Sequence, residues 1–148
     1  METRVIDGRK VAELIKAEVS EELQELSKKD LVPGLAAVLV GDDPASQLYV
    51  RNKTRTCKEL GMHSETIELP GETTTEELLQ VIDRLNQADK IDAILVQLPL
   101  PDQIDEDRIL LSVRPDKDVD GFHPLNVRNL VSGKWVLPPV PPWESCIC

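Results

Sequence analysis

Residues 91–101, Ile-Asp-Ala-Ile-Leu-Val-Gln-Leu-Pro-Leu-Pro, decide the fold class of this chain. Ala93 to Val96 is a short unbroken apolar run, which is typical of a strand covered on both faces. Gln97 then supplies one amide, and two prolines that cannot donate to a sheet ladder come after it. Such an exit places one polar side chain at the rim of the sheet, where ligands bind in open α/β folds. A core strand with a proline-rich exit and no ligand explains this stretch alone equally well.

The patterns on both sides of this stretch predict helices that alternate with strands. An apolar run predicts a strand over residues 35–40, and a weak alternation over residues 63–69 predicts a strand nearer an edge of the sheet. Apolar residues at helical spacing predict helices over residues 11–26, 44–60, 74–85 and 104–113. This order requires parallel strands joined by crossover helices, so we expect an α/β domain with three layers, α/β/α. From Arg114 onward the composition predicts loops.

Two kinds of turn chemistry support these helix starts. Asp43 is a plausible N-cap, with Pro44 at the first helical position. Thr73 or Thr74 can cap the next predicted helix. The boundaries of both helices should therefore be well defined.

Composition excludes several classes of partner. The chain has 148 residues, the size of one domain, and a formal net charge of −10, which argues against nucleic acid and anionic membranes. No segment approaches the roughly 20 apolar residues that span a bilayer, and the N-terminus has no secretory pattern. The three cysteines form neither a disulfide framework nor a zinc pattern. We therefore expect a cytoplasmic protein without bound metal.

Tyr49 and Lys53 stand four residues apart on a predicted helix, so they share a face one turn apart. A lysine beside an aromatic ring in a cleft loses hydration, which favours its neutral form and suits proton transfer. A surface tyrosine with a solvated lysine is the commoner explanation of an isolated pair. Short-chain dehydrogenases share this spacing, but they also carry a glycine-rich dinucleotide loop, and this sequence contains no Gly-x-Gly-x-x-Gly.

Three carboxylates, Asp116, Asp118 and Asp120, lie within five residues before a glycine. The pattern lacks the spaced ligands and distal glutamate of an EF-hand, and a zinc site would need more ligands than His123. Two interpretations remain open. The side chains can cap backbone amides of the loop, or one of them can point into the same cleft as Gln97 and bind a ligand rich in N–H groups.

Three motifs follow one another along the chain. They are Val-Gly-Asp-Asp-Pro-Ala-Ser-Gln-Leu-Tyr-Val-x-x-Lys over residues 40–53, Val-Gln-Leu-Pro-Leu-Pro over 96–101 and Lys-Asp-Val-Asp-Gly-Phe-His-Pro over 117–124. Together they closely resemble the N-terminal catalytic domain of the bifunctional methylenetetrahydrofolate dehydrogenase/methenyltetrahydrofolate cyclohydrolase family. The resemblance extends from near the N-terminus to about Leu137.

The resemblance implies a folate site in the cleft of this domain. Lys53 would be the catalytic residue that activates water or polarises the ligand, Gln97 would hydrogen-bond Lys53 and tune its protonation, and Asp120 would hold the pterin ring. Tyr49 would stack against the folate. The remaining pocket residues that the resemblance implies are Ser46, Leu98 and Pro99.

The same resemblance implies the partners of the complete enzyme. The family oxidises 5,10-methylenetetrahydrofolate with NADP or NAD and hydrolyses the methenyl product to 10-formyltetrahydrofolate, a reaction sequence of one-carbon metabolism that supplies purine biosynthesis. Its members are typically homodimers with a second, nucleotide-binding Rossmann domain. We expect that domain to be absent here, with no cofactor site in this chain and weak cyclohydrolase activity at best. A non-catalytic folate-binding or assembly fragment is the alternative.

The sequence departs from the family pattern at two places. Arg128 stands where members usually have a glycine, which would strain the loop if that glycine serves a left-handed turn or close packing. The family continues with Pro-Cys-Thr-Pro-x-Gly, and suitable codons for residues 139–148 spell Cys-Thr-Pro-x-Gly in another reading frame. We therefore expect a catalytic domain over residues 1–137 and an aberrant tail over 138–148 that is frame-shifted or vector-derived.

Overall fold

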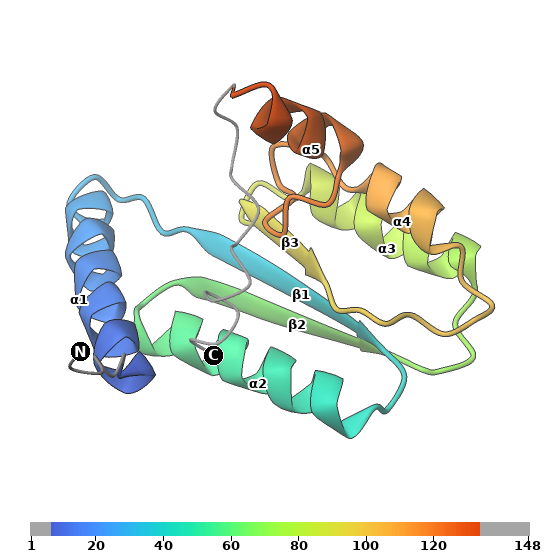
Figure 1. Cartoon of the computed structure of the whole chain (residues 1–148), viewed down its shortest axis with the longest axis horizontal. Coiled ribbons are helices and arrows are strands. Elements are labelled where there is room, and N and C mark those ends of the chain that lie inside the picture. Colours follow the sequence, from blue (N-terminus) through green and yellow to red (C-terminus); the bar gives the residue numbers. More distant parts are fainter. Residues whose placement is uncertain (1–6, 134–148) are drawn as a thin grey trace, which may run out of the picture.

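The computed structural model describes residues 7–133 of the chain, and the predicted tail over 138–148 lies outside this range (Figure 1). Helices and strands alternate through most of it, as the sequence predicts. The elements are α1 Gly8–Ser27, β1 Gly34–Val40, α2 Pro44–Glu59, β2 His63–Leu69, α3 Thr75–Gln87, β3 Ala93–Val96, α4 Glu106–Ser112 and α5 Pro124–Val131.

The described strands form one parallel sheet in the order β2-β1-β3. β1 is buried along its whole length and pairs on both sides, so that Val38 lies opposite Ile67 of β2 and Val96 of β3. β2 alternates between exposed and partly buried residues, as expected for an edge strand. The predicted strands and their parallel arrangement are confirmed.

Helices cover the two faces of the sheet, which gives the predicted α/β/α layers (Figure 1). We call the side that α3 and α4 cover the α3 face, and the opposite side the α2 face. The buried residues of the α3 face form one cluster: Ala36, Val38, Val40, Leu78, Ile82, Leu85, Ile91, Ile94, Val96, Ile104, Ile109 and Val113. The buried residues of the α2 face form a smaller cluster: Leu35, Ala37, Leu39, Val50 and Leu95.

Side-chain caps fix where α2 and α3 begin. The Asp43 carboxylate accepts a hydrogen bond of 2.7 Å from the backbone N–H of Ser46. This contact holds the pKa of Asp43 below its ordinary value. At α3, Thr74 and Glu77 form a reciprocal capping box, so Thr74 and not Thr73 is the N-cap. The predicted caps are confirmed, and the choice between the two threonines is resolved.

The region after Arg114, predicted to be loop, contains the helix α5. α5 begins with Pro124 at its first position and is capped by His123, whose Nδ1 accepts from the backbone N–H of Leu125 at 3.1 Å. The fully buried side chains of α5 are Asn126 and Asn129, while Leu130 and Val131 are exposed. A helix that buries its amides has no apolar stripe toward the core, which is why the periodicity does not reveal it.

α1 has the predicted length, but none of its residues is fully buried. It lies beyond the amino ends of the strands (Figure 1). Beside its end, a hollow of about 730 Å³ is lined by apolar residues such as Leu26 and Leu31 together with His63 and Asp92. Asp92 already accepts the backbone N–H of Gly34 at 2.8 Å. Within residues 7–133, no helix is long and apolar enough to cross a bilayer.

Candidate active site

Gln97 occupies the carboxyl end of β3 on the α2 face. Its backbone N–H donates to the carbonyl of Val38 at 2.9 Å, so the ladder continues one residue beyond the strand. Ala93 and Leu95 pack on the α2 face, and side chains alternate along a strand, so the Gln97 side chain belongs to the same face. Its amide Nε2 donates to the carbonyl of Leu98 at 2.7 Å.

α2 presents Tyr49 and Lys53 beside its buried stripe. Ser46, Val50 and Thr54 are buried, and α2 packs with them on β1 and β2. Lys53 and Tyr49 lie along one flank of that stripe, since they precede Thr54 and Val50 by one position each. Lys53 is partly exposed, and 48% of Tyr49 is exposed. This flank leaves both side chains accessible to a ligand.

The loop after α4 is anchored next to β3 by Lys117 and Asp118. The Lys117 ammonium donates to the carbonyls of Leu85 and Ala88 at the end of α3, at 3.3 and 2.9 Å. A cation is favourable there because the last carbonyls of a helix carry partial negative charge. The Lys117 carbonyl accepts the backbone N–H of Ile94 at 2.7 Å, and Asp118 makes an isolated parallel bridge to the same residue.

The Asp118 carboxylate organises the rest of this loop from inside. It is only 6% exposed and accepts hydrogen bonds from the backbone N–H groups of Gly121 at 3.1 Å and His123 at 2.8 Å. The side-chain amide of Asn126 donates to it at 2.9 Å. Asp118 is therefore the carboxylate that caps backbone amides, one of the two roles that the sequence left open.

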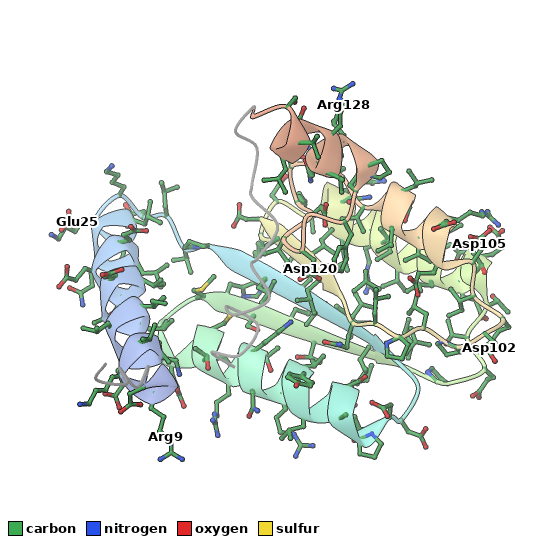
Figure 2. The ribbon with its side chains drawn as sticks, in the orientation of Figure 1. Arg9, Glu25, Asp102, Asp105, Asp120 and Arg128 are labelled. Atoms are coloured by element: carbon green, nitrogen blue, oxygen red, sulfur yellow. The ribbon has the colours of Figure 1, made fainter. Side chains whose placement is uncertain are left out.

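Asp120 is the carboxylate that remains for a ligand. Asp116 is paired with Arg114, and Asp118 is saturated by the loop. Burial raises the pKa of the Asp120 carboxyl above its ordinary value, the ammonium of Lys53 lowers it, and the charge of Asp118 raises it further. Figure 2 shows Asp120 in the middle of the molecule, whereas the other labelled charged residues lie at its periphery.

Lys53 and Asp120 are 67 positions apart in the sequence, but in the fold the charge of Lys53 acts on the Asp120 carboxyl and lowers its pKa. No ion pair joins them directly in the described residues, and the predicted hydrogen bond from Gln97 to Lys53 is not formed in this structure. Ser46 lies buried at the first turn of α2, nearer the carboxyl ends of the strands than Lys53. Leu98 and Pro99 follow Gln97 directly and are joined by a cis peptide bond.

Arg128 lies in the middle of α5 and is exposed, and its side chain points away from the sheet (Figure 2). Among residues 7–133 the only non-glycine residue with positive φ is Asp30. The expected strain of a left-handed turn at position 128 is therefore wrong, because the residue has ordinary helical backbone.

No group of three or more His, Cys, Asp or Glu side chains in the described range is arranged to hold a metal ion. The candidate groups on the α2 side are instead the Lys53 ammonium, the Gln97 amide, the Asp120 carboxylate and the Tyr49 phenol. They suit an organic ligand that carries N–H donors and a flat ring. The fold defines a parallel α/β domain, and the carboxyl ends of the strands in such a sheet are where ligands usually bind.

The particular family follows from comparison with known proteins. The tetrahydrofolate dehydrogenase/cyclohydrolase catalytic domain matches residues 6–120, which is most of the chain. The chain belongs to this family. The bifunctional protein FolD of Geotalea daltonii is 50% identical over 140 residues, which cover 95% of this chain and 50% of that protein.

Solved structures agree in fold. The FolD enzyme of Campylobacter jejuni superposes with a TM-score of 0.87 at 46% identity, over 90% of this chain and 48% of that one. The Trypanosoma brucei enzyme, solved with NADP and an inhibitor, superposes with a TM-score of 0.84 at 39% identity, over 88% of this chain and 44% of that one. The chain thus spans about half the length of the relatives it matches.

Sequence reasoning left the role of Asp118 open, and it missed the supporting roles of Lys117 and Asn126. The neighbouring motif residues carry the recognisable chemistry, whereas Lys117 and Asn126 act on other parts of the protein. A single signal could have found Asn126, because Pro124 at a first helical position after His123 predicts a helix start. A helix there places Asn126 within reach of the preceding loop.

Proposed function

We propose that this chain is the folate-binding, catalytic part of a cytoplasmic enzyme of one-carbon metabolism, a homodimer when complete. The enzyme oxidises 5,10-methylenetetrahydrofolate with NADP or NAD and hydrolyses the product to 10-formyltetrahydrofolate. The observation that carries the proposal is the match of the tetrahydrofolate dehydrogenase/cyclohydrolase catalytic domain to residues 6–120, and the burial of the Asp120 carboxyl near the charge of Lys53 agrees with it. Lys53, Gln97 and Asp120 are the proposed catalytic residues, and the proposed substrate-binding residues are Tyr49, Ser46, Leu98 and Pro99.

Asp120 suits the pterin ring of a folate. The edge of a pterin carries several N–H donors, and an acceptor-only carboxylate can take two of them in charge-assisted hydrogen bonds. Burial raises the pKa of Asp120, which means that its ionised form lacks part of its hydration. Ligand N–H groups would replace that hydration. The exposed ring of Tyr49 is available to stack on the pterin or on the benzoyl ring.

Lys53 suits the hydrolytic step. Water adds its oxygen to the cationic carbon that bridges N5 and N10, and it gives one proton to the neutral amine of Lys53. The bond from this carbon to N5 then breaks, the second proton of the water ends on N5, and the carbon remains on N10 as a formyl group. Lys53 can alternatively act as an ammonium that polarises the ligand. Gln97, on the same face, would orient the Lys53 nitrogen through a hydrogen bond.

The dehydrogenase step needs a dinucleotide, and we infer that the turn between β1 and α2 does not bind its pyrophosphate. Gly41 is followed by Asp42, Asp43 and Pro44, so the turn between β1 and α2 offers carboxylates where a pyrophosphate would need backbone N–H groups. Asp43 also occupies the amides at the start of α2. We therefore place the NADP site of the complete enzyme in the half that the relatives have beyond this match, and we derive no hydride step here.

The test is the hydrolysis of 5,10-methenyltetrahydrofolate, followed by its near-ultraviolet absorbance with and without this chain. Lys53→Met should remove any rate above the uncatalysed one, while calorimetry shows that tetrahydrofolate still binds. Lys58→Met is the matched control, because Lys58 is an exposed lysine at the end of the same helix. Hydrolysis that survives Lys53→Met would overturn the role of Lys53.

The same experiment distinguishes the catalytic enzyme from the second candidate function, a non-catalytic folate-binding or assembly fragment. The absence of any fully buried residue in α1 favours this candidate, since an apolar stripe without a cover suits assembly. Tetrahydrofolate binding without hydrolysis in the wild type would support it. Added NADP should change neither readout, and a cofactor-dependent signal would contradict both candidates.

A further inference from the structure

The loop that carries Asp120 is held by a buried pair of polar side chains, Asp118 and Asn126. Asn126 is 1% exposed and donates both amide protons, to the Asp118 carboxylate at 2.9 Å and to the carbonyl of Pro115 at 2.8 Å. Both acceptors precede Asp120 in the chain, so Asn126 ties α5 to the segment that leads into Asp120. Neither side chain belongs to the site residues assigned above.

Asn126 is a costly choice for a buried helix position. Its Oδ1 is buried and accepts no hydrogen bond in the described part of the chain. A buried acceptor without a donor costs free energy that an apolar side chain of similar size would not. Stability alone thus does not account for an amide at this position, whereas its two donated hydrogen bonds to the loop do.

The hydrogen bonds of the pair define the shape of the loop around Asp120. Asp118 accepts from Gly121, which has a φ of 70°, and from His123. These contacts close the chain on both sides of Asp120, and the intervening Val119 packs on the α2 face. The position of Asp120 consequently depends on the buried side chains of Asp118 and Asn126.

We propose that Asp118 and Asn126 are positioning residues, whose buried hydrogen bond holds Asp120 in place opposite Lys53. The proposal rests on the proposed function only for the identity of the ligand. Without the hydrogen bond, Asp120 turns toward water and the two charged groups separate. The site then loses its acceptor for the N–H edge of the ligand while α2 and β3 stay in place.

The test uses Asn126→Leu, with Asn129→Leu as its matched control. Asn129 is a similarly buried asparagine of the same helix, 7% exposed, and its side chain makes no hydrogen bond to the loop. Titration of ¹³C-labelled aspartate by NMR, with Asp120 assigned by the signal that Asp120→Asn removes, reports its environment without any ligand. Asn126→Leu should shift the Asp120 titration toward that of a hydrated aspartate, and Asn129→Leu should not.

Binding of tetrahydrofolate, measured by calorimetry, gives the second readout. Asn126→Leu should weaken binding roughly tenfold in the wild-type background and less than about twofold when Asp120→Asn is already present, since both changes remove the same contact. An unchanged Asp120 titration in a folded Asn126→Leu variant would overturn the proposal, and so would equal losses of affinity in both backgrounds.

The two readouts distinguish failure of the proposed function from failure of the positioning role. If wild-type protein binds no tetrahydrofolate, the proposed function fails, and the titration still decides the positioning role. If Asn126→Leu does not fold, as judged by circular dichroism, Asp118→Asn replaces it, because it keeps the volume and removes an acceptor. A folded Asp118→Asn variant with wild-type affinity for tetrahydrofolate would also overturn the proposal.

Discussion

The two faces of the sheet differ in how completely helices cover them. In the described residues, twelve buried side chains form the core of the α3 face, whereas five form that of the α2 face. On the α2 face the helix packs on β1 and β2, and β3 is met there by Val119 of a loop. Of the proposed site residues, Tyr49, Lys53 and Gln97 lie on this less covered side. The α3 face therefore supplies most of the buried core, whereas the less covered α2 face carries side chains for which we propose a binding role.

The largest expected effect comes from removing a leucine from the closed α3 face. Leu78 of α3 is fully buried, so Leu78→Ala should lower the free energy of unfolding by about 4 kcal/mol, through lost burial and a cavity. Leu95→Ala makes the same change on the α2 face and should cost about 2–3 kcal/mol, because fewer buried neighbours surround it. Urea unfolding measures both. A larger loss of stability for Leu95→Ala than for Leu78→Ala would contradict the conclusion that the α3 face holds the more completely packed core.

The next effect is steric and lies at the start of the central strand. A Cβ added to Gly34 would come within 1.8 Å of the carbonyl oxygen of Lys90, a backbone atom that cannot simply turn away. Gly34→Ala should therefore destabilise by about 1–3 kcal/mol as β1 and β3 are pushed apart. Gly61→Ala is not a suitable control, because Gly61 has positive φ.

Gly8→Ala provides the control for this prediction. An added Cβ at Gly8 would meet nothing within 4 Å, so the change should leave the urea midpoint almost unchanged. If Gly34→Ala is as harmless as Gly8→Ala, the contact between β1 and the connection before β3 is looser than this structure shows.

The helix α3 depends on its capping box. Thr74→Ala removes the acceptor for the backbone N–H of Glu77 and should cost about 1 kcal/mol. Thr74→Ser keeps a hydroxyl at this position and should restore most of the loss. Thermal melting can measure both changes. A full-sized loss in Thr74→Ser would mean that the threonine methyl group, not the hydrogen bond, is what matters.

The sequence predicts the elements of the α3 face better than those of the α2 face, for a physical reason. Burial on both faces leaves apolar runs such as residues 93–96, and crossover helices keep a regular apolar stripe, so strands and helices could be located. The helix α5 could not be located from the sequence, because the side chains that it buries are Asn126 and Asn129. Likewise, adjacent carboxylates look equivalent in sequence, and only the folded loop distinguishes the capping Asp118 from Asp120.

The smallest expected effect has the opposite sign and lies in the site itself. Because burial raises the pKa of Asp120 above its ordinary value of 3.8, the folded state binds the proton more tightly than the unfolded state. Ionisation of Asp120 therefore opposes folding, and the penalty grows as pH rises from about 4 through the raised pKa. Asp120→Asn removes the charge and should raise Tm by a few degrees at pH 7, with no gain near pH 4.

Asp102→Asn is the control, since Asp102 lies at the periphery and is exposed (Figure 2). It should leave Tm unchanged at both pH values. A fall in Tm for Asp120→Asn at pH 7 would mean that attraction to Lys53 outweighs the cost of burial, and Asp120 would then stabilise the fold. A rise in Tm with loss of tetrahydrofolate binding would instead show that the open face keeps a destabilising carboxylate for its ligand, which is the usual cost of a binding site.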